Sequence, residues 1–116
     1  MITKLKDNQV FVFGSNLNGF HAGCAAKQAY EQFGAEWGIG EGLTGQSYAF
    51  PTLDKNMQQV NMSDLEISRN KLYNTANSMP YLEFLLTPVG TGIAGFDIEV
   101  ISELFKNCPI NITRLF

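Results

Sequence analysis

Two glycine-rich loops in this chain combine residue types that could hold a phosphate group. The first loop, GSNLNGFHAG, spans residues 14–23, and the second, GTGIAGF, spans residues 90–96. Small residues before a helix let an anion approach the free N–H groups and the positive end of the helix dipole. A glycine-rich backbone can also curl its amides around an anion. The loops therefore predict an anion site, although the second could also be a tight turn whose glycines need positive φ.

Three side chains near these loops could take part in catalysis. His21, the only histidine, stands at the mouth of the first loop and could act as a general acid or base. Asp54 follows a predicted strand and could orient a water molecule, while Lys55 could pair with a phosphate or act as a nucleophile. Each has a plainer interpretation, because a lone histidine often begins a helix and charged loop residues are usually solvated.

Other common site signatures do not occur in the sequence. The first loop does not match the GxGxxG fingerprint, and the Gly-Lys-Ser/Thr of a P-loop is missing. Cys24 and Cys108 belong to no CxxC or Cys/His cluster, so we expect neither a disulfide framework nor a metal site. The formal net charge is -3 and the eight Lys and Arg residues are scattered, which argues against a nucleic-acid partner. We also expect no bound cofactor.

Strands and helices must alternate along the chain to position these loops. An apolar run at 9–13 predicts a buried strand, and the spacing of apolar residues after it predicts a helix. The predicted strands are 9–13, 47–50, 82–87 and 110–116, and the predicted helices lie near 22–33, 64–78 and 98–107. This alternation predicts an α/β three-layer sandwich, in which a mostly parallel or mixed sheet has helices on both faces.

Local signals set the expected ends of these elements. Pro51 is expected to stop the second strand. Residues 34–46 hold five glycines, so little regular structure is expected there. Ser63 and Glu66 match a capping box, and Asp97 is a candidate N-cap for the last helix.

The length and composition indicate one domain over residues 1–116. The 116 residues are 45% hydrophobic and 16% charged, which suits one core and leaves no room for a second. No segment approaches the ~20 apolar residues that cross a bilayer, and the start lacks the apolar segment of a secretory signal. We therefore expect a cytoplasmic protein with no membrane partner.

Three unusual segments, 14–23, 51–55 and 90–96, each follow a predicted strand. In an open α/β sheet, ligands bind in the crevice outside the carboxyl ends of the strands. We therefore expect these segments to meet around one ligand.

The order of these loops resembles the macrodomain family. In that family a strand leads to a loop with a key asparagine and a glycine cluster, and a later loop wraps a diphosphate; residues 13–16, 19–26 and 90–96 are similar to these parts. Residues 42–52 are similar to the family's strand that ends near the distal ribose. The resemblance covers most of the chain. It implies a macrodomain-like fold, of a short bacterial or phage type, that binds ADP-ribose or a related NAD-derived nucleotide.

The resemblance also implies roles for single residues. The Asn16 amide would contact the ribose next to the scissile bond, or, in the plainer interpretation, close an Asx-type turn in its own loop. The candidate catalytic residues are Asn16, Asp54 and His21. The expected ligand-binding residues are Gly14, Ser15, Gly19, Gly23, Cys24, Gly90, Thr91, Gly92, Ile93, Ala94, Gly95 and Phe96.

The chain also departs from the family pattern. It lacks the early strand and helix and the acidic residue that often holds adenine, although Phe20 or Trp37 could cover that base. Cys24 stands where a glycine would be unsurprising, and Ala94 stands where one hydrolytic branch has a catalytic Asp. The main prediction is ADP-ribose-type binding, with hydrolysis of ADP-ribosyl linkages as an added activity. The alternatives are a non-catalytic nucleotide-binding or sequestering module and a structural or interaction domain.

Overall fold

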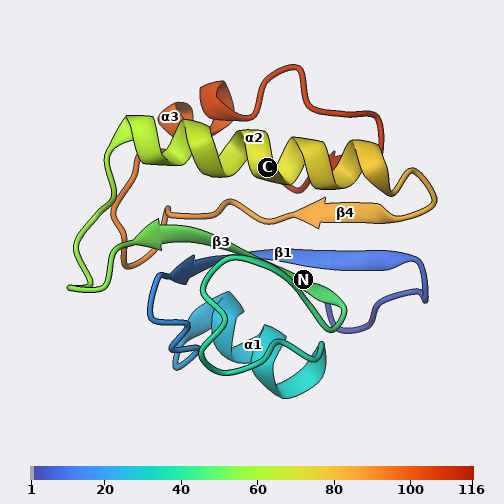
Figure 1. Cartoon of the computed structure of the whole chain (residues 1–116), viewed down its shortest axis with the longest axis horizontal. Helices are drawn as coiled ribbons and strands as arrows, with labels where there is room; N and C mark the ends of the chain where they lie inside the picture. Colours follow the sequence, from blue (N-terminus) through green and yellow to red (C-terminus); the bar gives the residue numbers. More distant parts are fainter. Residues whose placement is uncertain (1) are drawn as a thin grey trace.

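The computed structural model of the chain describes residues 2–116, in which strands and helices alternate (Figure 1). The elements are β1 (Gln9–Asn16), α1 (Cys24–Gln32), β2 (Gly42–Thr44), β3 (Ser47–Leu53), α2 (Met62–Ser78), β4 (Glu83–Leu86), α3 (Ile98–Leu104) and β5 (Ile112–Arg114). The predicted α/β class is confirmed. No helix within residues 2–116 has both the length and the apolar character that crossing a membrane requires.

The strands form one mixed sheet in the order β2-β3-β1-β4-β5. β1 lies at its centre and pairs in parallel with β3 and with β4, while β5 continues the parallel set beside β4. β2 alone is antiparallel, and it pairs with the start of β3. The carboxyl ends of β1, β3 and β4 therefore point the same way, to the left in Figure 1.

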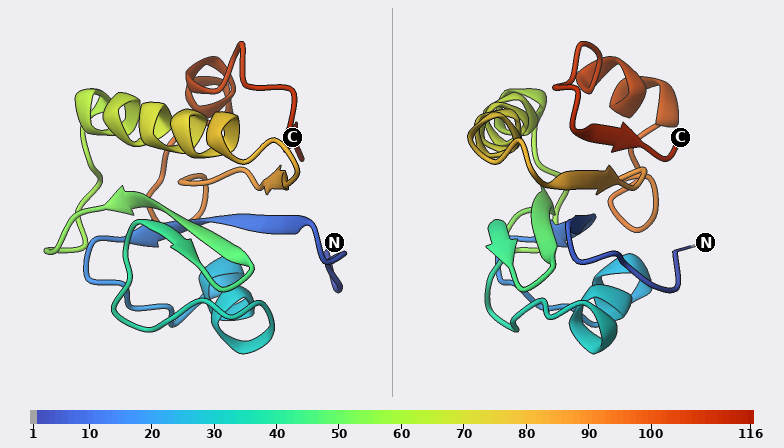
Figure 2. Two further views of the ribbon diagram at one scale, coloured as in Figure 1. Left: turned by 45° about the vertical axis from the view of Figure 1, so that its right-hand side comes forward. Right: turned by 90° about the vertical axis from the view of Figure 1, so that its right-hand side faces the viewer.

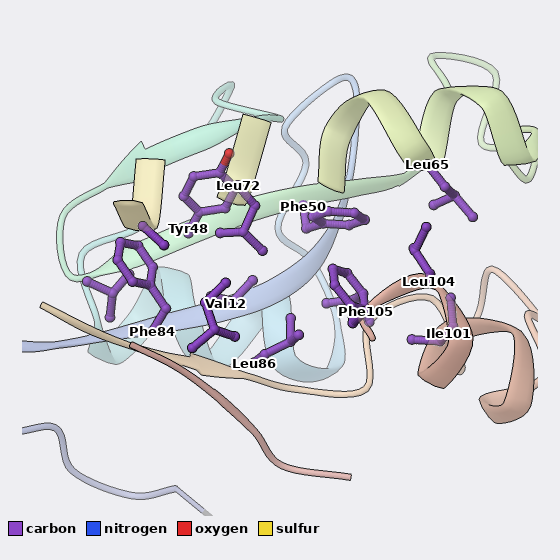
Figure 3. Close-up of a cluster of buried hydrophobic side chains, with 14 of the residues drawn as sticks. Val12, Tyr48, Phe50, Leu65, Leu72, Phe84, Leu86, Ile101, Leu104 and Phe105 are labelled. Carbon is purple, nitrogen blue, oxygen red and sulfur yellow. The ribbon is translucent and has the colours of Figure 1, made fainter. Parts of the chain in front are cut away.

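Helices cover both faces of the sheet, which gives three layers (Figure 2). Side chains alternate across a strand, so Val10 and Val12 join the core beneath α2 and α3, and Phe11 and Phe13 join the smaller core beneath α1. Figure 3 shows the larger core, where Phe50 and Phe105 pack in a T-shaped pair with ring centroids 5.2 Å apart. Burial on both faces fixes β1 in the middle of the sheet.

The prediction that Pro51 stops the second strand is wrong, because β3 runs on to Leu53. A proline fits a strand where no backbone N–H is needed, at an unpaired side or a bulge. β2 pairs only as far as Ala49, so the outer side of β3 is free at Pro51, and the pairing with β1 shifts register next to it. The extra length carries Thr52 and Leu53 to the carboxyl end of the sheet.

The expectation of little regular structure in 34–46 is wrong for Gly42–Thr44, which forms β2. Gly45 has a φ of +61° and follows β2 directly, so it takes the turn position that favours glycine in two-residue hairpins. That turn sends the chain back as β3.

The predicted capping box is also wrong. α2 begins at Met62, and its N-cap is Asn61, whose Oδ1 accepts a hydrogen bond from the Asp64 amide at 2.8 Å. Ser63 therefore lies inside the helix. Asp97 is the N-cap of α3 as predicted, but its side chain makes no capping hydrogen bond.

Candidate functional site

A cavity of about 340 Å³ lies at the carboxyl ends of β1, β3 and β4. Its walls are residues 14–16 at the end of β1, residues 22–26 at the start of α1, Thr52 and Leu53 of β3, and residues 87–94 after β4. Phe20 and Met57 also contribute. The segments that follow three strands thus meet at one cavity, as the sequence predicted.

A second cavity, of about 730 Å³, adjoins the first on the α1 face of the sheet. It is lined mainly by apolar residues, among them Ile2, Phe11 and Leu115, together with Gln28. The two cavities share Cys24, Ala25 and Thr87 as lining residues. We refer to both cavities together as the cleft. It runs along the sheet edge from the end of β3, past β1, to the β4–β5 side.

Most of the predicted ligand-binding residues line this cleft. These are Gly14, Ser15, Gly23, Cys24, Gly90, Thr91, Gly92, Ile93 and Ala94, to which the candidate catalytic residue Asn16 is added. Five predicted residues are not among the lining residues: Gly19, His21, Asp54, Gly95 and Phe96. Both loops therefore contribute to the cleft, but only some of the residues in each loop line it.

The second loop and the first turn of α1 both include backbone amides that have no protein acceptor, on residues that line the first cavity. Within residues 2–116, the amides of Gly92, Ile93 and Ala94 donate no hydrogen bond, while Gly95 and Phe96 close the loop by donating to Gly92 and Gly90. Opposite them, the first amide of α1 bonded within the helix is that of Lys27, so those of Cys24, Ala25 and Ala26 are free. Two runs of free amides on one cavity are the kind of donors that anion-binding sites use.

Two glycines of the second loop have different roles. Gly90 has a φ of +77°, and a Cβ there would lie 2.9 Å from Cδ2 of Phe96. Phe96 itself packs against the larger core, and its N–H donates to the Gly90 carbonyl at 2.9 Å. Gly92 is open, because a Cβ there would meet no atom within 4 Å. Gly90 thus shapes the loop, and Gly92 leaves space in the cavity.

Asn16 lines the cavity, and its side-chain amide makes two hydrogen bonds within its own loop. Its Nδ2 donates to the Phe20 carbonyl at 2.9 Å, and its Oδ1 accepts from the Phe20 amide at 3.1 Å. The side chain is buried, as is that of Ser15, whose Oγ donates to the Gly40 carbonyl at 2.5 Å. These contacts match the plainer interpretation of Asn16, in which it holds the turn.

His21 is 1% exposed and lies outside the lining of either cavity. Its Nε2 is 2.9 Å from the Glu36 carbonyl oxygen and, since a carbonyl only accepts, Nε2 donates. The ring packs edge-on against Phe13, and its Nδ1 has no partner within residues 2–116. The imidazole thus joins the first loop to the segment around Glu36.

Asp54 also holds a turn. Its Oδ1 accepts from the amides of Asn56 at 2.8 Å and Gln58 at 3.0 Å. Lys55, next to it, is exposed, and its carbonyl accepts a hydrogen bond from Asn18 Nδ2 at 2.9 Å. Neither residue lines the cleft.

The cleft carries little ionisable chemistry. Cys24 is the single ionisable residue among those that line the cleft in the described chain, and no group of three or more His, Cys, Asp or Glu within residues 2–116 could hold a metal ion. The groups whose pKa is shifted lie outside the cleft. Burial raises the pKa of Tyr48 and raises that of Tyr73 to about 12. A hydrogen bond from Gln9 lowers the pKa of Glu83. The cleft therefore offers a ligand mainly backbone groups and apolar side chains.

Cys24 has a left-handed backbone, with a φ of +54°. This conformation favours glycine, which agrees with the expectation that a glycine would be unsurprising at this position. The residue is exposed, and it lines both cavities at their junction.

Sequence reasoning missed several lining residues. Met57 lies on a turn beyond β3, and Ile2, Gln28 and Leu115 enclose the second cavity. No local pattern marks them, because Ile2 and Leu115 come from opposite ends of the chain and meet only through the tertiary fold. Phe20 and Trp37, both half-exposed, stack with ring centroids 5.8 Å apart, and of the two only Phe20 lines the cleft.

Comparison with solved structures finds a similar fold. The macrodomain of Mycobacterium tuberculosis DarG superposes with a TM-score of 0.68, over 94% of this chain and 89% of that one. The two sequences are 15% identical, so the likeness establishes the fold and nothing finer. No protein-family model and no curated protein sequence matches the chain.

Proposed function

We propose, from the macrodomain fold that this chain has, that its cleft binds ADP-ribose or a closely related NAD-derived nucleotide. The observation that carries the proposal is the pair of free amide runs, Cys24–Ala26 and Gly92–Ala94, on one cavity. A pyrophosphate between them would accept hydrogen bonds from both sides, and the α1 dipole would favour its charge.

The shape of the cleft supports one orientation of the nucleotide. The second cavity is mostly apolar, and Gln28 and Thr87 are among its polar side chains. Gln28 Nε2 donates to the Ile2 carbonyl, and its Oε1 can accept a hydrogen bond from the edge of a base. With the base there, the pyrophosphate lies beside the free amides, and the terminal ribose lies toward Asn16 and Thr52. Both volumes fall within the roughly 300–1,000 Å³ of typical small-molecule sites.

Binding without turnover is the form of this function that the side chains support best. General acid–base hydrolysis needs a titratable group within hydrogen-bond reach of the substrate. No carboxylate or imidazole lines the cleft in the described chain, and Ala94 stands where the hydrolytic branch has its Asp. The amide of Asn16, the remaining candidate, is held by Phe20.

The binding proposal is tested by isothermal calorimetry with ADP-ribose, AMP, NAD and cyclic ADP-ribose. We expect ADP-ribose to bind more tightly than AMP, because AMP has no pyrophosphate to meet both amide runs. Absence of heat with all four ligands would overturn the proposal.

We expect hydrolysis of ADP-ribosyl esters to be weak or absent. The measurement is release of free ADP-ribose from an esterified substrate at a protein concentration that saturates it. Release well above the spontaneous rate would contradict binding without turnover. Asn16→Ala would then show whether the amide contributes, because loss of one preorganised polar contact costs roughly 2–4 kcal/mol of transition-state stabilisation.

Cys24 offers a direct reporter of occupancy. A bound nucleotide would cover its exposed thiol, so we expect ADP-ribose to slow alkylation of Cys24 by N-ethylmaleimide about tenfold at ten times the Kd, by mass action. Peptide mass spectrometry measures the rate, and Cys108, outside the cleft, serves as the internal control. Equal rates with and without ligand would place the nucleotide elsewhere.

A further inference from the structure

Met57 is an exposed apolar residue that contributes to the wall of the first cavity. It lies between β3 and α2, on the segment at the left of Figure 1, and the residue is 47% exposed. Its φ is +60°, in the left-handed region that side chains other than glycine rarely adopt. Such a conformation persists where the surrounding structure fixes it, and it is frequent at ligand sites.

The turn that holds Met57 is fixed by hydrogen bonds within residues 54–58. The Met57 amide donates to the Asp54 carbonyl at 3.0 Å, and the Asp54 amide donates to the Gln58 carbonyl at 2.8 Å. The Asp54 carboxylate accepts from the residues on either side of Met57, Asn56 and Gln58. Asp54 therefore has a structural task here, which is to hold Met57 at the tip of the turn.

Two further hydrogen bonds tie this turn to both glycine-rich loops. Asn18 Nδ2, in the first loop, donates to the Lys55 carbonyl at 2.9 Å. Gln59 Nε2 donates to the carbonyl of Ala94, in the second loop, at 2.9 Å. The position of Met57 is thus set relative to the free amides.

The sheet order places Met57 at one end of the cleft. β3 lies on one side of β1, whereas β4 and β5 lie on the other. Met57 follows β3, and the second cavity includes Thr87 after β4 and Leu115 after β5. A nucleotide whose base occupies the second cavity therefore has its terminal ribose at the Met57 end.

We propose that Met57 is a specificity-determining residue, which packs its flexible thioether chain against the terminal ribose and so favours ADP-ribose over ADP. Methionine adapts its shape to irregular surfaces, and the C–H face of a sugar presents one. The proposal rests on the proposed function. It assigns to Met57 the contact with the one group that ADP lacks.

The test is titration of the parent protein and of Met57→Gly with ADP-ribose and with ADP. Glycine suits a φ of +60°, so we expect the variant to keep or raise the melting temperature of the unliganded protein. We expect its Kd for ADP-ribose to rise roughly tenfold, while its Kd for ADP stays within about twofold of the parent value. Met57→Leu, which keeps an apolar side chain, should restore most of the preference.

The outcomes separate this proposal from the binding proposal. If Met57→Gly binds ADP-ribose as tightly as the parent, or loses affinity for ADP and ADP-ribose equally, Met57 does not read the terminal ribose and the inference fails. A parent protein that binds neither ligand overturns the binding proposal itself, which the parent titration alone reveals. If Met57→Gly is destabilised, Met57→Asn provides the same comparison, because asparagine also tolerates the left-handed region.

Discussion

Gly92→Glu should abolish the thermal stabilisation by ADP-ribose while leaving the unliganded protein as stable as its parent. A Cβ at this position would meet no atom within 4 Å, so a side chain can leave the backbone here without a clash. The added carboxylate would stand in the first cavity, next to the amides proposed to hold the pyrophosphate. Like charges in contact cost several kcal/mol, so we expect the affinity to fall by at least ~100-fold.

Gly92→Gln is the matched control for charge, because glutamine has nearly the same shape as glutamate. We expect it to weaken binding less, since steric block remains and repulsion does not. Differential scanning fluorimetry measures both variants, because a ligand selective for the native state must raise the melting temperature. A parent-like shift in Gly92→Glu would show that the ligand occupies another site.

The fold could be predicted from the sequence because its signals are local. Continuous apolar runs marked the buried parallel strands, and helical spacing marked α1 to α3, so the three layers and the order of all elements except β2 followed. The likeness to a macrodomain followed from the order of the loops and agrees with the superposed structure. The predictions that failed were strand β2 and those element boundaries that depend on neighbouring segments. Pro51 can stay in β3 because the pairing with β2 does not extend beyond Ala49, which no local rule reveals.

The location of the candidate site could be predicted from the sequence. The roles of its individual side chains could be predicted less well. Glycine loops after parallel strands had to meet at the carboxyl edge, and they do. Whether a polar side chain is free depends on its partners. Asn16 and Asp54 both bond to backbone amides of their own turns, and His21 is buried against Phe13. The plainer interpretations of all three, as residues that shape loops or turns, agree better with these contacts than catalytic roles do.

Gly19 illustrates this difference, and we expect Gly19→Ala to lower the free energy of unfolding by about 3 kcal/mol or more, as steric overlap with fixed backbone does. Gly19 has a φ of +70°, and its carbonyl accepts a hydrogen bond from the Gly38 amide at 2.9 Å. An added Cβ would lie 2.7 Å from the Gly38 Cα, with two more backbone atoms of Gly38 and Ile39 closer still. Backbone cannot rotate away as a side-chain end can, so the first loop must separate from residues 38–39.

Gly23→Ala is the matched control, since it adds the same methyl group to the same loop. Gly23 has a φ of -148°, which any residue adopts, and a Cβ there would meet no atom within 4 Å. We expect its urea midpoint to match that of the parent, whereas the midpoint of Gly19→Ala should fall with an unchanged slope. Equal midpoints for the two variants would mean that the first loop does not pack against residues 38–39. The ordering of the free amides at Cys24–Ala26 would then need another cause, because the contact at Gly19 is one that holds the loop leading into α1.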